Sequence, residues 1–406
     1  MLKSKDSPNS LDQRNATRLR VLEHIRTRGS ISRTDIASAL QTSPATVTAA
    51  TADLIAAGLV KETEGETSAK SAKRGRPRVL LQLDGRSHLV AGLKVARHVI
   101  SVLLVDFEGN EVTSHMHQLK DVQMTPVAFV ATVRLALEEA CDRINGSIQQ
   151  LAGVSIGIAG LVDAKRNFVH WSSSITDRNV DFSYLFSEGL PCPTFVENDA
   201  NLVAKAEQLF GQGKGLKNFL VVTIEHGVGL GIVLDGKLYR GERGCGAEFG
   251  HAKVQLDGAL CQCGQRGCLE AYVGDYALLR EMTVTGHSSE MANVSDIHVQ
   301  ANSGDQRAAS VLARAGQMFG LGVSNLINLF DPECIILSGA QMSMEHLCSE
   351  DVMNRIKNGV VNVDAPLPEI KIHQWGDLMW SKGAAAYGIE QVSILKVQEL
   401  AVQHAP

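Results

Sequence analysis

The 406-residue sequence contains no apolar run long enough to cross a membrane. Its longest apolar runs, such as Phe219 to Ile224 and Ile335 to Leu337, are far shorter than the roughly 18 residues that a membrane-spanning helix needs. We therefore expect no membrane insertion. Disorder is also excluded, because 44% of the residues are hydrophobic and only 20% are charged, as in globular proteins that are long enough for two or three domains.

The sequence also lacks the signals of a secreted protein. Its first ten residues are polar and contain no apolar core of a signal peptide. The eight cysteines have irregular spacing, unlike the framework of a disulfide-rich extracellular domain. Both features predict a protein of the reducing cytoplasm.

Charge is distributed unevenly along the chain. Residues 1–83 carry 14 Lys and Arg against 8 Asp and Glu, a net charge of +6, and because the whole chain carries −5, the remainder carries −11. A basic segment on an acidic body is typical of a polyanion-binding module attached to a part with another task. Charge alone leaves open a second interpretation, a solvated basic face.

Three short helical patterns occupy residues 19–58. The first is apolar at helical spacing and closes at a glycine. The second, over about residues 33–40, begins with the spacing of a capping box. The third follows the N-cap signal Ser43-Pro44 and ends near Gly58.

Two short helices joined by a tight turn are typical of a helix-turn-helix, which places its second helix in the major groove of DNA. Ser43, Thr46 and Thr48 are the candidate DNA contacts, because small hydroxyl side chains at a helix N-terminus can approach phosphates or base edges. A plain three-helix packing unit is the alternative.

A basic segment follows between two short strand patterns, residues 59–63 and 79–83. It contains R-G-R-P at residues 74–77, in which Arg74 and Arg76 suit the narrow minor groove of A·T-rich DNA. A flexible basic linker is the alternative for this segment. Its position directly after the helix-turn-helix favours the wing of a winged helix, so we expect a DNA-binding domain over residues 1–83.

From about residue 89 the pattern changes to apolar strands alternating with amphipathic helices, which predicts an α/β architecture. The clearest predicted strands are 99–107, 154–158, 219–224, 231–234 and 335–337, and the clearest predicted helices are 125–144, 200–210 and 308–330.

A cluster of metal-binding residue types lies near the middle of the chain. Cys261, Cys263 and Cys268 fall within eight residues, and His251 lies ten residues before the first of them. Three thiolates and one imidazole form a closed tetrahedral set of the structural zinc type. The single residue between the first two cysteines is a tighter spacing than in common zinc fingers, so three separate thiols remain the alternative on the motif alone.

Five motifs carry a resemblance to a known family. They are S-I-G-I-A-G-L-V-D at 155–163, E-N-D-A-N at 197–201, G-x-G-x-G-I-V at 227–233, G-A-E-F-G-H at 246–251 and C-x-C-G-x-x-G-C-L-E at 261–270. With these motifs the chain resembles the ROK family of transcriptional repressors and sugar kinases.

This resemblance implies a two-lobed, actin-like (ribonuclease H-like) α/β body with a sugar-binding cleft between the lobes. The first lobe would span residues 84–199 and be completed by a C-terminal helix near 380–398. The second lobe would span residues 200–379 and hold the zinc site and the contacts of a homodimer or homotetramer.

The resemblance also implies roles for individual residues. The positions of His251, Cys261, Cys263 and Cys268 match the ligands of a structural Zn²⁺ in the family. The positions that match hexose contacts are Asn198, Asp199, Glu248 and Glu270. We expect His251 to serve twice, with one ring nitrogen on zinc and the other turned toward a ligand hydroxyl. In the family kinases the residue that matches Asp199 is the general base. On spacing alone, an Asn-Asp pair at a helix start is more often a cap.

The phosphate-binding positions depart from the kinase pattern. Where the family kinases carry D-x-G-G-T, the alignment places Lys94, Ala96, Arg97 and His98. Side chains in place of the glycines obstruct the approach of backbone to phosphate. In the second loop Glu225 would repel a triphosphate. The sugar-side residues are kept and the phosphate-side residues are lost, which predicts a sensor rather than an enzyme.

We therefore expect a DNA-binding transcriptional regulator, a repressor of carbohydrate uptake or metabolism genes. Its expected partners are operator DNA and a sugar or sugar-phosphate effector bound in a degenerate kinase cleft. One alternative is a ROK sugar kinase with an accessory DNA-binding domain. Another is a repressor controlled by a protein of a sugar-transport (phosphotransferase) system.

Overall fold

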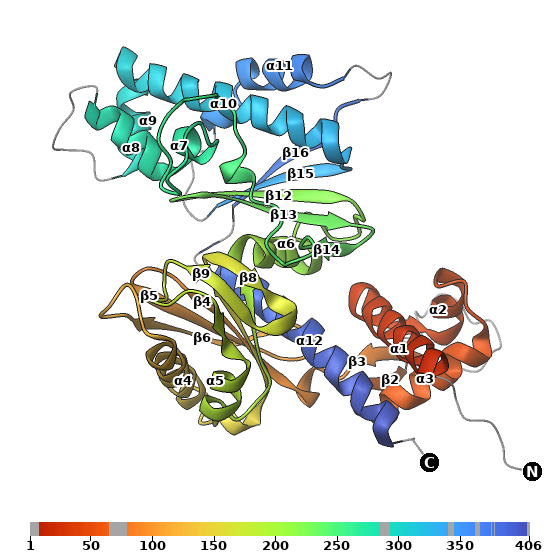
Figure 1. Ribbon diagram of the computed structural model, residues 1–406. Helices are drawn as coiled ribbons and strands as arrows, with labels where there is room; N and C mark the ends of the chain where they lie inside the picture. Colours follow the sequence, from red (N-terminus) through yellow and green to blue (C-terminus); the bar gives the residue numbers. More distant parts are fainter. Residues whose placement is uncertain are drawn as a thin grey trace, which may run out of the picture.

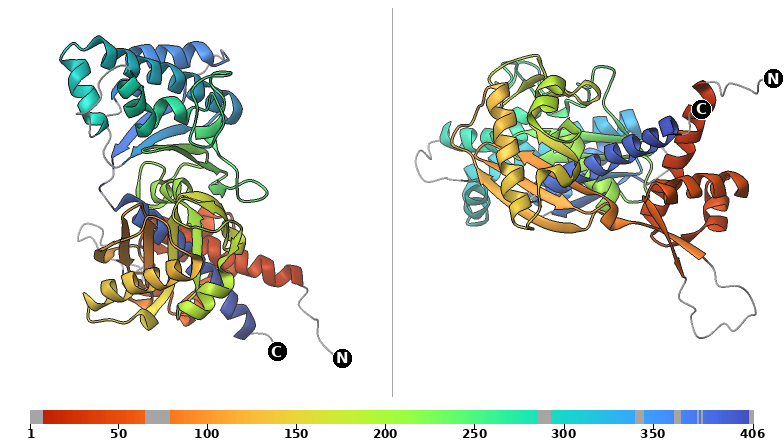
Figure 2. Two further views of the ribbon diagram at one scale, coloured as in Figure 1. Left: turned by 60° about the vertical axis from the view of Figure 1, so that its left-hand side comes forward. Right: turned by 90° about the horizontal axis from the view of Figure 1, so that it is seen from below.

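The computed structural model describes residues 8–64, 79–284, 293–339, 345–361, 366–374, 376 and 378–403. These residues form a small N-terminal unit and two α/β lobes stacked on each other (Figure 1). The right-hand view of Figure 2 shows the N-terminal unit at the side of the first lobe. Within the described ranges, no helix combines the length and the apolar character that crossing a bilayer requires.

The N-terminal unit is a winged helix. Its elements are α1 (Pro8–Arg28), β1 (Ile31–Ser32), α2 (Arg33–Ala39), α3 (Pro44–Ala56), β2 (Val60–Glu64) and β3 (Val79–Leu83). Strand β3 pairs antiparallel with both β1 and β2. Ser32 and Ser43 cap α2 and α3, because each side-chain oxygen accepts a hydrogen bond from the backbone N–H three residues ahead. The predicted second and third helices and both predicted strands are confirmed.

The first helix is longer than expected. Helix α1 begins at Pro8, well before Leu19, where the apolar pattern starts. The guanidinium of Arg18 forms an ion pair with the carboxylate of Asp53 in α3 at 2.6 Å, and only 2% of the Arg18 side chain is exposed. This buried pair holds α1 against α3, and a contact between distant residues leaves no periodic signal in the sequence.

The first lobe is built on a five-stranded sheet in the order β11-β7-β4-β5-β6. Its strands are β4 (Leu89–Val95), β5 (Val99–Val105), β6 (Glu111–Gln118), β7 (Leu151–Ile158) and β11 (Thr194–Asn198), and a small antiparallel sheet adds β8 (Gly160–Asp163), β9 (Phe168–Ser172) and β10 (Val180–Asp181). Helices α4 (Pro126–Asp142) and α5 (Phe182–Gly189) cover one face, and α12 (Met379–Gln403) covers the other.

The second lobe repeats this plan with the sheet order β14-β13-β12-β15-β16. Its strands are β12 (Phe219–Ile224), β13 (Val228–Leu234), β14 (Lys237–Tyr239), β15 (Cys334–Gly339) and β16 (Glu369–Gln374). Its helices are α7 (Glu270–Val273), α8 (Asp275–Val284), α9 (Val294–Asn302), α10 (Gln306–Phe330) and α11 (Glu350–Gly359). Helix α6 (Asp199–Phe210) lies between the two lobes (Figure 1).

The predicted elements of the body are confirmed. The five predicted strands correspond to β5, β7, β12, β13 and β15, and the three predicted helices correspond to α4, α6 and α10. Strands β4, β7 and β11 run parallel, so their C-terminal ends meet at one edge of the sheet. Lys94, near the end of β4, and Asn198, at the end of β11, therefore lie at the same edge, beside α6.

Candidate functional site

The centre of the candidate site is an ion pair between Lys94 and Asp199. The Lys94 ammonium contacts the carboxylate of Asp199, the first residue of α6. Their side chains are only 12% and 23% exposed. The same ammonium lies 5.6 Å from the centre of the Trp380 ring in α12. Lys94 thus places a positive charge on the residue whose family counterpart in the kinases is the general base.

Two further carboxylates come from the second lobe. Glu248 precedes the short helix η4 (Phe249–His251), and Glu270 begins α7. Desolvation and the like charges of Asp199 and Glu270 raise the pKa of Glu248 to about 7, although 44% of its side chain is exposed. The structure therefore places the Glu248 and Glu270 carboxylates of the second lobe near the carboxylate of Asp199.

Asn198 acts as the cap that its sequence position also allowed. Its side-chain oxygen accepts hydrogen bonds from the backbone N–H groups of Ala200 and Asn201 at 2.9 and 3.3 Å. Its amide nitrogen donates to the carbonyl of Gly160 at 2.9 Å. One amide hydrogen is left over for a ligand, so the main effect of Asn198 is to fix the start of α6 and with it Asp199.

Glu270 is held by the loop that corresponds to the second phosphate loop of the kinases. Its carboxylate accepts hydrogen bonds from the Val228 backbone N–H and the Tyr276 hydroxyl, both at 3.3 Å. A Cβ atom on Gly227 would lie 2.7 Å from this carboxylate. A side chain at position 227 would displace this carboxylate, and the acidic group beside Gly227 disfavours a phosphate at the same place.

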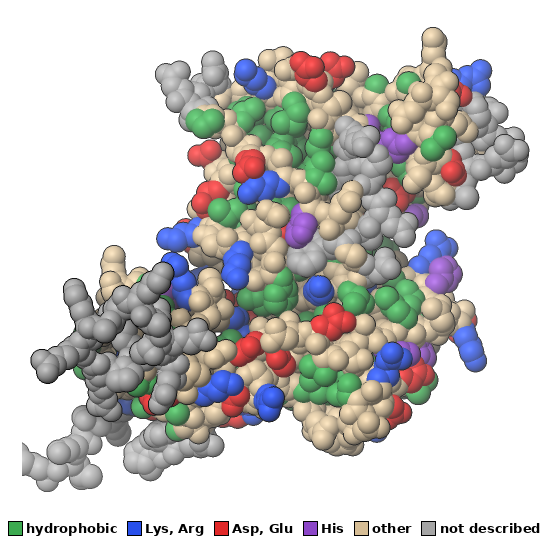
Figure 3. Space-filling view, turned by 180° about the vertical axis from the view of Figure 1, so that it is seen from behind, with side chains coloured by type: hydrophobic (Ala, Val, Ile, Leu, Met, Phe, Trp, Pro, Cys, Tyr) green, Lys and Arg blue, Asp and Glu red, His purple; other side chains and the backbone are tan. Residues whose placement is uncertain are grey.

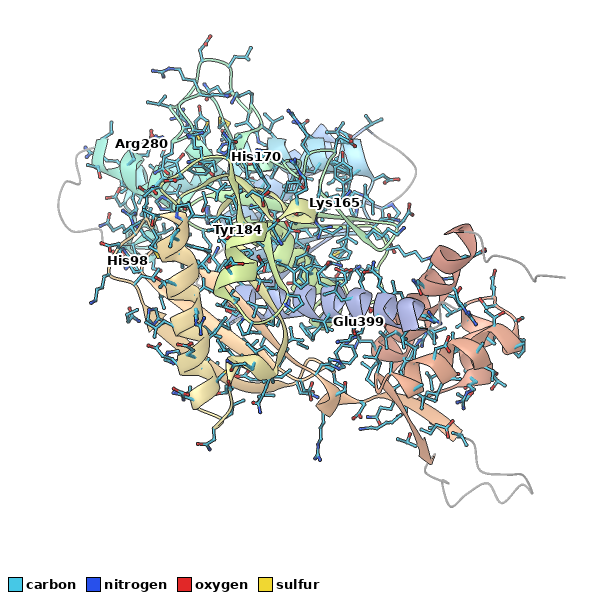
Figure 4. All side chains as sticks on the ribbon, turned by 60° about the horizontal axis from the view of Figure 1, so that its bottom comes forward. His98, Lys165, His170, Tyr184, Arg280 and Glu399 are labelled. Carbon is cyan, nitrogen blue, oxygen red and sulfur yellow. The ribbon has the colours of Figure 1, made fainter. Side chains whose placement is uncertain are left out.

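The first phosphate loop is also changed in shape and chemistry. It is a tight turn between β4 and β5, closed by a 2.9 Å hydrogen bond from the Ala96 N–H to the Val99 carbonyl. Arg97 and His98 are exposed at its tip, and Figure 4 shows His98 at this end of the sheet. A turn closed on itself and carrying side chains offers no open row of N–H groups for a phosphate.

The four predicted metal ligands are brought together. One donor atom of each of His251, Cys261, Cys263 and Cys268 lies within 4.8 Å of all the others. The sulfur atoms of Cys263 and Cys268 are 3.7 Å apart, close to the roughly 3.8 Å edge of a tetrahedron of thiolates about 2.3 Å from zinc. The donor set and its spacing therefore fit Zn²⁺.

His251 connects the sulfur cluster to the carboxylates. Its Nδ1 atom is 3.7 Å from the Cys261 sulfur, while its Nε2 atom is 4.0 Å from the Glu248 carboxylate. The ring therefore has one nitrogen on the side of the sulfur cluster and the other on the side of Glu248. The imidazole can thus serve the metal on one side and the sugar-side residues on the other.

Close backbone contacts fix the conformation of the loop that carries the three cysteines of the sulfur cluster. Lys253 pairs with Cys268 in an isolated antiparallel bridge, and the Lys253 ammonium lies 2.9 Å from the Cys268 sulfur. Gly267 has φ +76°, and a Cβ atom there would lie 1.7 Å from the Gln255 carbonyl oxygen. Only glycine fits at this position. The tight backbone turn at Gly267 places Cys268 close to Cys261 and Cys263.

Three of the candidate DNA contacts lie at the N-cap and in the first two turns of α3. Ser43, Thr46 and Thr48 are all exposed. The Ser43 hydroxyl oxygen accepts a hydrogen bond from the Thr46 N–H at 3.1 Å, so the Ser43 side chain stabilises the start of α3. The Thr48 hydroxyl donates to the Pro44 carbonyl at 2.8 Å. Arg74 and Arg76 lie outside the described residues.

Charged side chains are distributed over the surface of both lobes. In the space-filling view from behind, basic and acidic side chains are interspersed over the described parts of both lobes (Figure 3). On this face both lobes carry side chains of both signs, and several Lys and Arg side chains gather on the side toward the N-terminal unit (Figure 3).

Helix α12 joins the candidate site to the winged helix. Lys205 of α6 forms an ion pair with Glu390 of α12 at 2.8 Å. One turn further on, the Ser393 hydroxyl accepts a hydrogen bond from Arg26 of α1 at 3.2 Å, and Arg26 also donates to the Phe107 carbonyl at 2.6 Å. Figure 4 shows Glu399, near the end of α12, beside the winged helix.

Sequence reasoning missed part of this site. Lys94 was recognised as a changed kinase position but not as the partner of Asp199. Glu197 is fully buried and paired with Arg240 at 2.6 Å, which braces the strand end before Asn198. A glutamate at the end of a buried strand was a signal for such a partner, but the sequence does not indicate which arginine would reach it.

Comparisons with known proteins agree with this architecture. The family model described as "ROK family" matches residues 90–389, and the model described as "MarR family" matches residues 15–71. The xylose repressor of Bacillus spizizenii is 27% identical over 341 residues, which cover 84% of this chain and 86% of the repressor. The glucokinase of Streptomyces coelicolor is 31% identical over 313 residues, covering 73% of this chain and 96% of the kinase.

A solved structure of similar shape is that of a ROK family transcriptional regulator described as a homolog of the Escherichia coli MLC protein. It has a TM-score of 0.81 and 25% sequence identity, and the match covers 96% of this chain and 99% of that chain. The similarity therefore includes the winged helix as well as both lobes.

Proposed function

The chain belongs to the ROK family, and from this premise we propose that it is a DNA-binding transcriptional regulator controlled by a sugar or sugar phosphate. The winged helix supplies the DNA-binding part, with the exposed first turn of α3 directed at the major groove. The relatives include both a repressor and a glucokinase, so the choice between the two depends on the site itself.

The ion pair between Lys94 and Asp199 is the observation that favours a regulator over a kinase. A general base must accept a proton from a substrate hydroxyl, and an ammonium group bound to its carboxylate opposes that transfer. Lys94 also stands where the family kinases have an acidic residue. The closed turn at Ala96 and the carboxylate of Glu270 beside Gly227 disfavour the phosphates of a nucleotide.

The proposed effector is a polyhydroxylated ligand between the two lobes. Carboxylates and amides bind vicinal hydroxyls through several hydrogen bonds, and imidazole adds a further donor or acceptor. The proposed contacts are Asn198, Asp199, Glu248, His251 and Glu270. A ligand held by both lobes changes their relative position, because it favours the arrangement in which all of its partners can reach it.

Helix α12 is the proposed route from effector to DNA. It contacts α6 through Lys205 and Glu390, and α1 through Ser393 and Arg26. A shift of α6 on effector binding would therefore displace α12 and the attached winged helix. In a homodimer or homotetramer this displacement would change the spacing of two DNA-binding heads, whose half-sites lie about one helical turn of DNA or a multiple apart.

We also propose that His251, Cys261, Cys263 and Cys268 hold a structural Zn²⁺. The ion would cross-link the loop and have no catalytic role, because four protein ligands leave no open coordination position. It would hold the His251 ring and the start of α7, and so place Glu248 and Glu270 for the effector. A cytoplasmic location is part of this proposal, since DNA and reduced thiolates are both found there.

The proposal is tested by duplex selection from a random library, followed by binding measurements on the selected duplex. We expect sequence-preferring binding that weakens steeply with salt and changes on addition of one sugar or sugar phosphate from a hexose and pentose panel. Absence of sequence-preferring binding at low salt would contradict the regulator. Release of DNA by a sugar-transport protein but by no small ligand would favour protein control.

The kinase remains the second candidate because of the relative that is 31% identical. It predicts ATP-dependent phosphorylation of glucose or an N-acetylated hexose that Asp199→Asn abolishes. The regulator predicts no such phosphorylation by the unmodified chain.

A further inference from the structure

A second group of metal-binding side chains lies in the first lobe, away from the sulfur cluster. His115 and His117 are two residues apart on the edge strand β6, so their side chains point to the same face of the sheet. Their cross-strand neighbours are Val102 and Ile100, which belong to the core beneath α4. Glu139, in the last turns of α4, reaches down to the same place.

The three side chains converge on one point. The Nε2 atom of His115 and the Nδ1 atom of His117 each lie 2.8 Å from the same carboxylate oxygen of Glu139. One donor atom from each of the three residues lies within 4.8 Å of the others. Such convergence from a strand and a helix is the arrangement that a three-ligand metal site needs.

The charge of the group also suits a cation. Among the described residues, Glu139 forms no ion pair with a lysine or arginine; its ion-pair partners are the two histidines. A glutamate carboxyl group is ordinarily ionised at neutral pH, as a metal ligand must be.

We propose that His115, His117 and Glu139 form a second metal site, which binds a divalent transition-metal ion of the Zn²⁺ type. Two imidazoles and one carboxylate favour zinc, nickel, cobalt or copper over magnesium or calcium, which prefer sites made of oxygen alone. Three protein ligands leave at least one position for water. The side chains are 22%, 15% and 38% exposed, so an ion can enter from solvent.

The bound ion would tie the edge strand β6 to the end of α4. His115 also lines a cavity of about 640 Å³ with Arg143, which follows α4, and with Met379 and Lys382 at the start of α12. The cavity thus reaches from β6 to the start of α12. The proposed metal site does not depend on the regulator proposal, because its ligands take no part in the sugar-side group.

The test is a metal titration of the full chain after treatment with a chelator. We expect the unmodified chain to bind two ions, of which Cys263→Ser disturbs one and Glu139→Gln the other. Glu139→Gln should weaken the second site by roughly tenfold or more, since even indirect partners of a metal ligand are worth that much. Co²⁺ at this site should show d–d absorption without a thiolate-to-metal band, and Zn²⁺ should raise the melting temperature.

The matched control is Glu138→Gln, which removes the neighbouring carboxylate on α4, paired with Arg134 at 2.9 Å. It should bind metal as the unmodified chain does. His117→Asn gives a second, independent removal of a ligand. Equal metal affinity and stoichiometry in Glu139→Gln, His117→Asn and the unmodified chain would overturn the proposal and leave a purely hydrogen-bonded His–Glu–His group.

Discussion

Lys94 and Asp199 lie 105 positions apart in the sequence, and their side chains form an ion pair at the edge where the sheet of the first lobe meets α6. The pair joins a residue that departs from the kinase pattern to a residue that is kept. Asp199 therefore retains a carboxylate for hydrogen bonds to a ligand, while its charge is balanced by Lys94 rather than by a metal ion or a transferred proton.

The first prediction concerns this pair. Lys94→Met should lower the free energy of unfolding by about 1–3 kcal/mol, the cost of leaving a partly buried polar group without its partner, because Asp199 then faces Glu248 and Glu270 without a cation. A double-mutant cycle with Asp199→Asn should give a coupling energy of about 0.5–3 kcal/mol in urea unfolding. Lys396→Met, which removes the partner of the more exposed Glu399, is the control and should change little. Additive single changes would argue against the pair.

The second prediction concerns the recognition helix. Thr48→Glu should weaken binding to the selected duplex by roughly fivefold or more, because a like-charge pair at contact distance costs about 1 kcal/mol even in water. Thr283→Glu on α8 is the control, since Thr283 is also exposed and donates to the carbonyl four residues before it. Unchanged DNA affinity in Thr48→Glu, measured by fluorescence anisotropy, would remove α3 from the interface.

The third prediction concerns the connection between the body and the winged helix. Arg26→Met should cost about 1.5–3 kcal/mol of stability, the usual value for hydrogen bonds from a charged group, because only 4% of the Arg26 side chain is exposed. It should also reduce the factor by which the effector changes DNA affinity. Arg28→Met, exposed at the end of the same helix, should do neither. Full effector control in Arg26→Met would contradict a route through this contact.

The fourth prediction concerns the sulfur cluster. Cys263→Ser should lower the zinc content by about one ion per chain and lower the melting temperature, because metal binding is coupled to folding of its loop. It should also weaken effector binding, since Glu270 follows the last cysteine by two residues. Cys245→Ser lies outside the cluster and serves as the control. Metal analysis that finds the same zinc content in both variants would refute the assignment.

The fifth prediction concerns pH. Burial and the nearby Lys396 ammonium lower the pKa of His88 from its ordinary value of 6.5, although Glu399 and Asp84 act in the opposite direction. The folded chain therefore favours neutral His88. Its contribution to stability is present above about pH 6.5 and is lost as pH falls through the lowered pKa. Melting temperatures between about pH 5 and 8 should fall less steeply on acidification in His88→Asn.

His98→Asn, at the exposed β4–β5 turn, is the control for this pH series. His24 of α1 also has a lowered pKa, caused by burial and Arg28, and it remains in both variants. The difference between the two variants therefore isolates His88. If the melting temperatures of His88→Asn and of the unmodified chain depend on pH in the same way, His88 does not contribute to the pH dependence of stability.

The agreement between sequence and structure follows the range of the interactions involved. The caps at Ser32 and Ser43, the bounds of β12 and the four residues of the sulfur cluster were all accessible from the sequence, because each depends on neighbours within about one to two dozen positions. The start of α1 was missed because its first part, residues 8–18, is almost entirely polar and has no apolar period to mark a helix.

The sequence by itself determined the order of modules, the helix-turn-helix and the α/β body, because hydrophobic periodicity and local capping depend on consecutive residues. The set of carboxylates followed from the resemblance of short motifs to the ROK family. Only the tertiary structure decided that Lys94 neutralises Asp199, that α12 reaches Arg26, and that His115 and His117 meet Glu139. Parallel strands and crossing helices bring together side chains that are far apart in the chain, and the choice of partner depends on which ends of those elements meet.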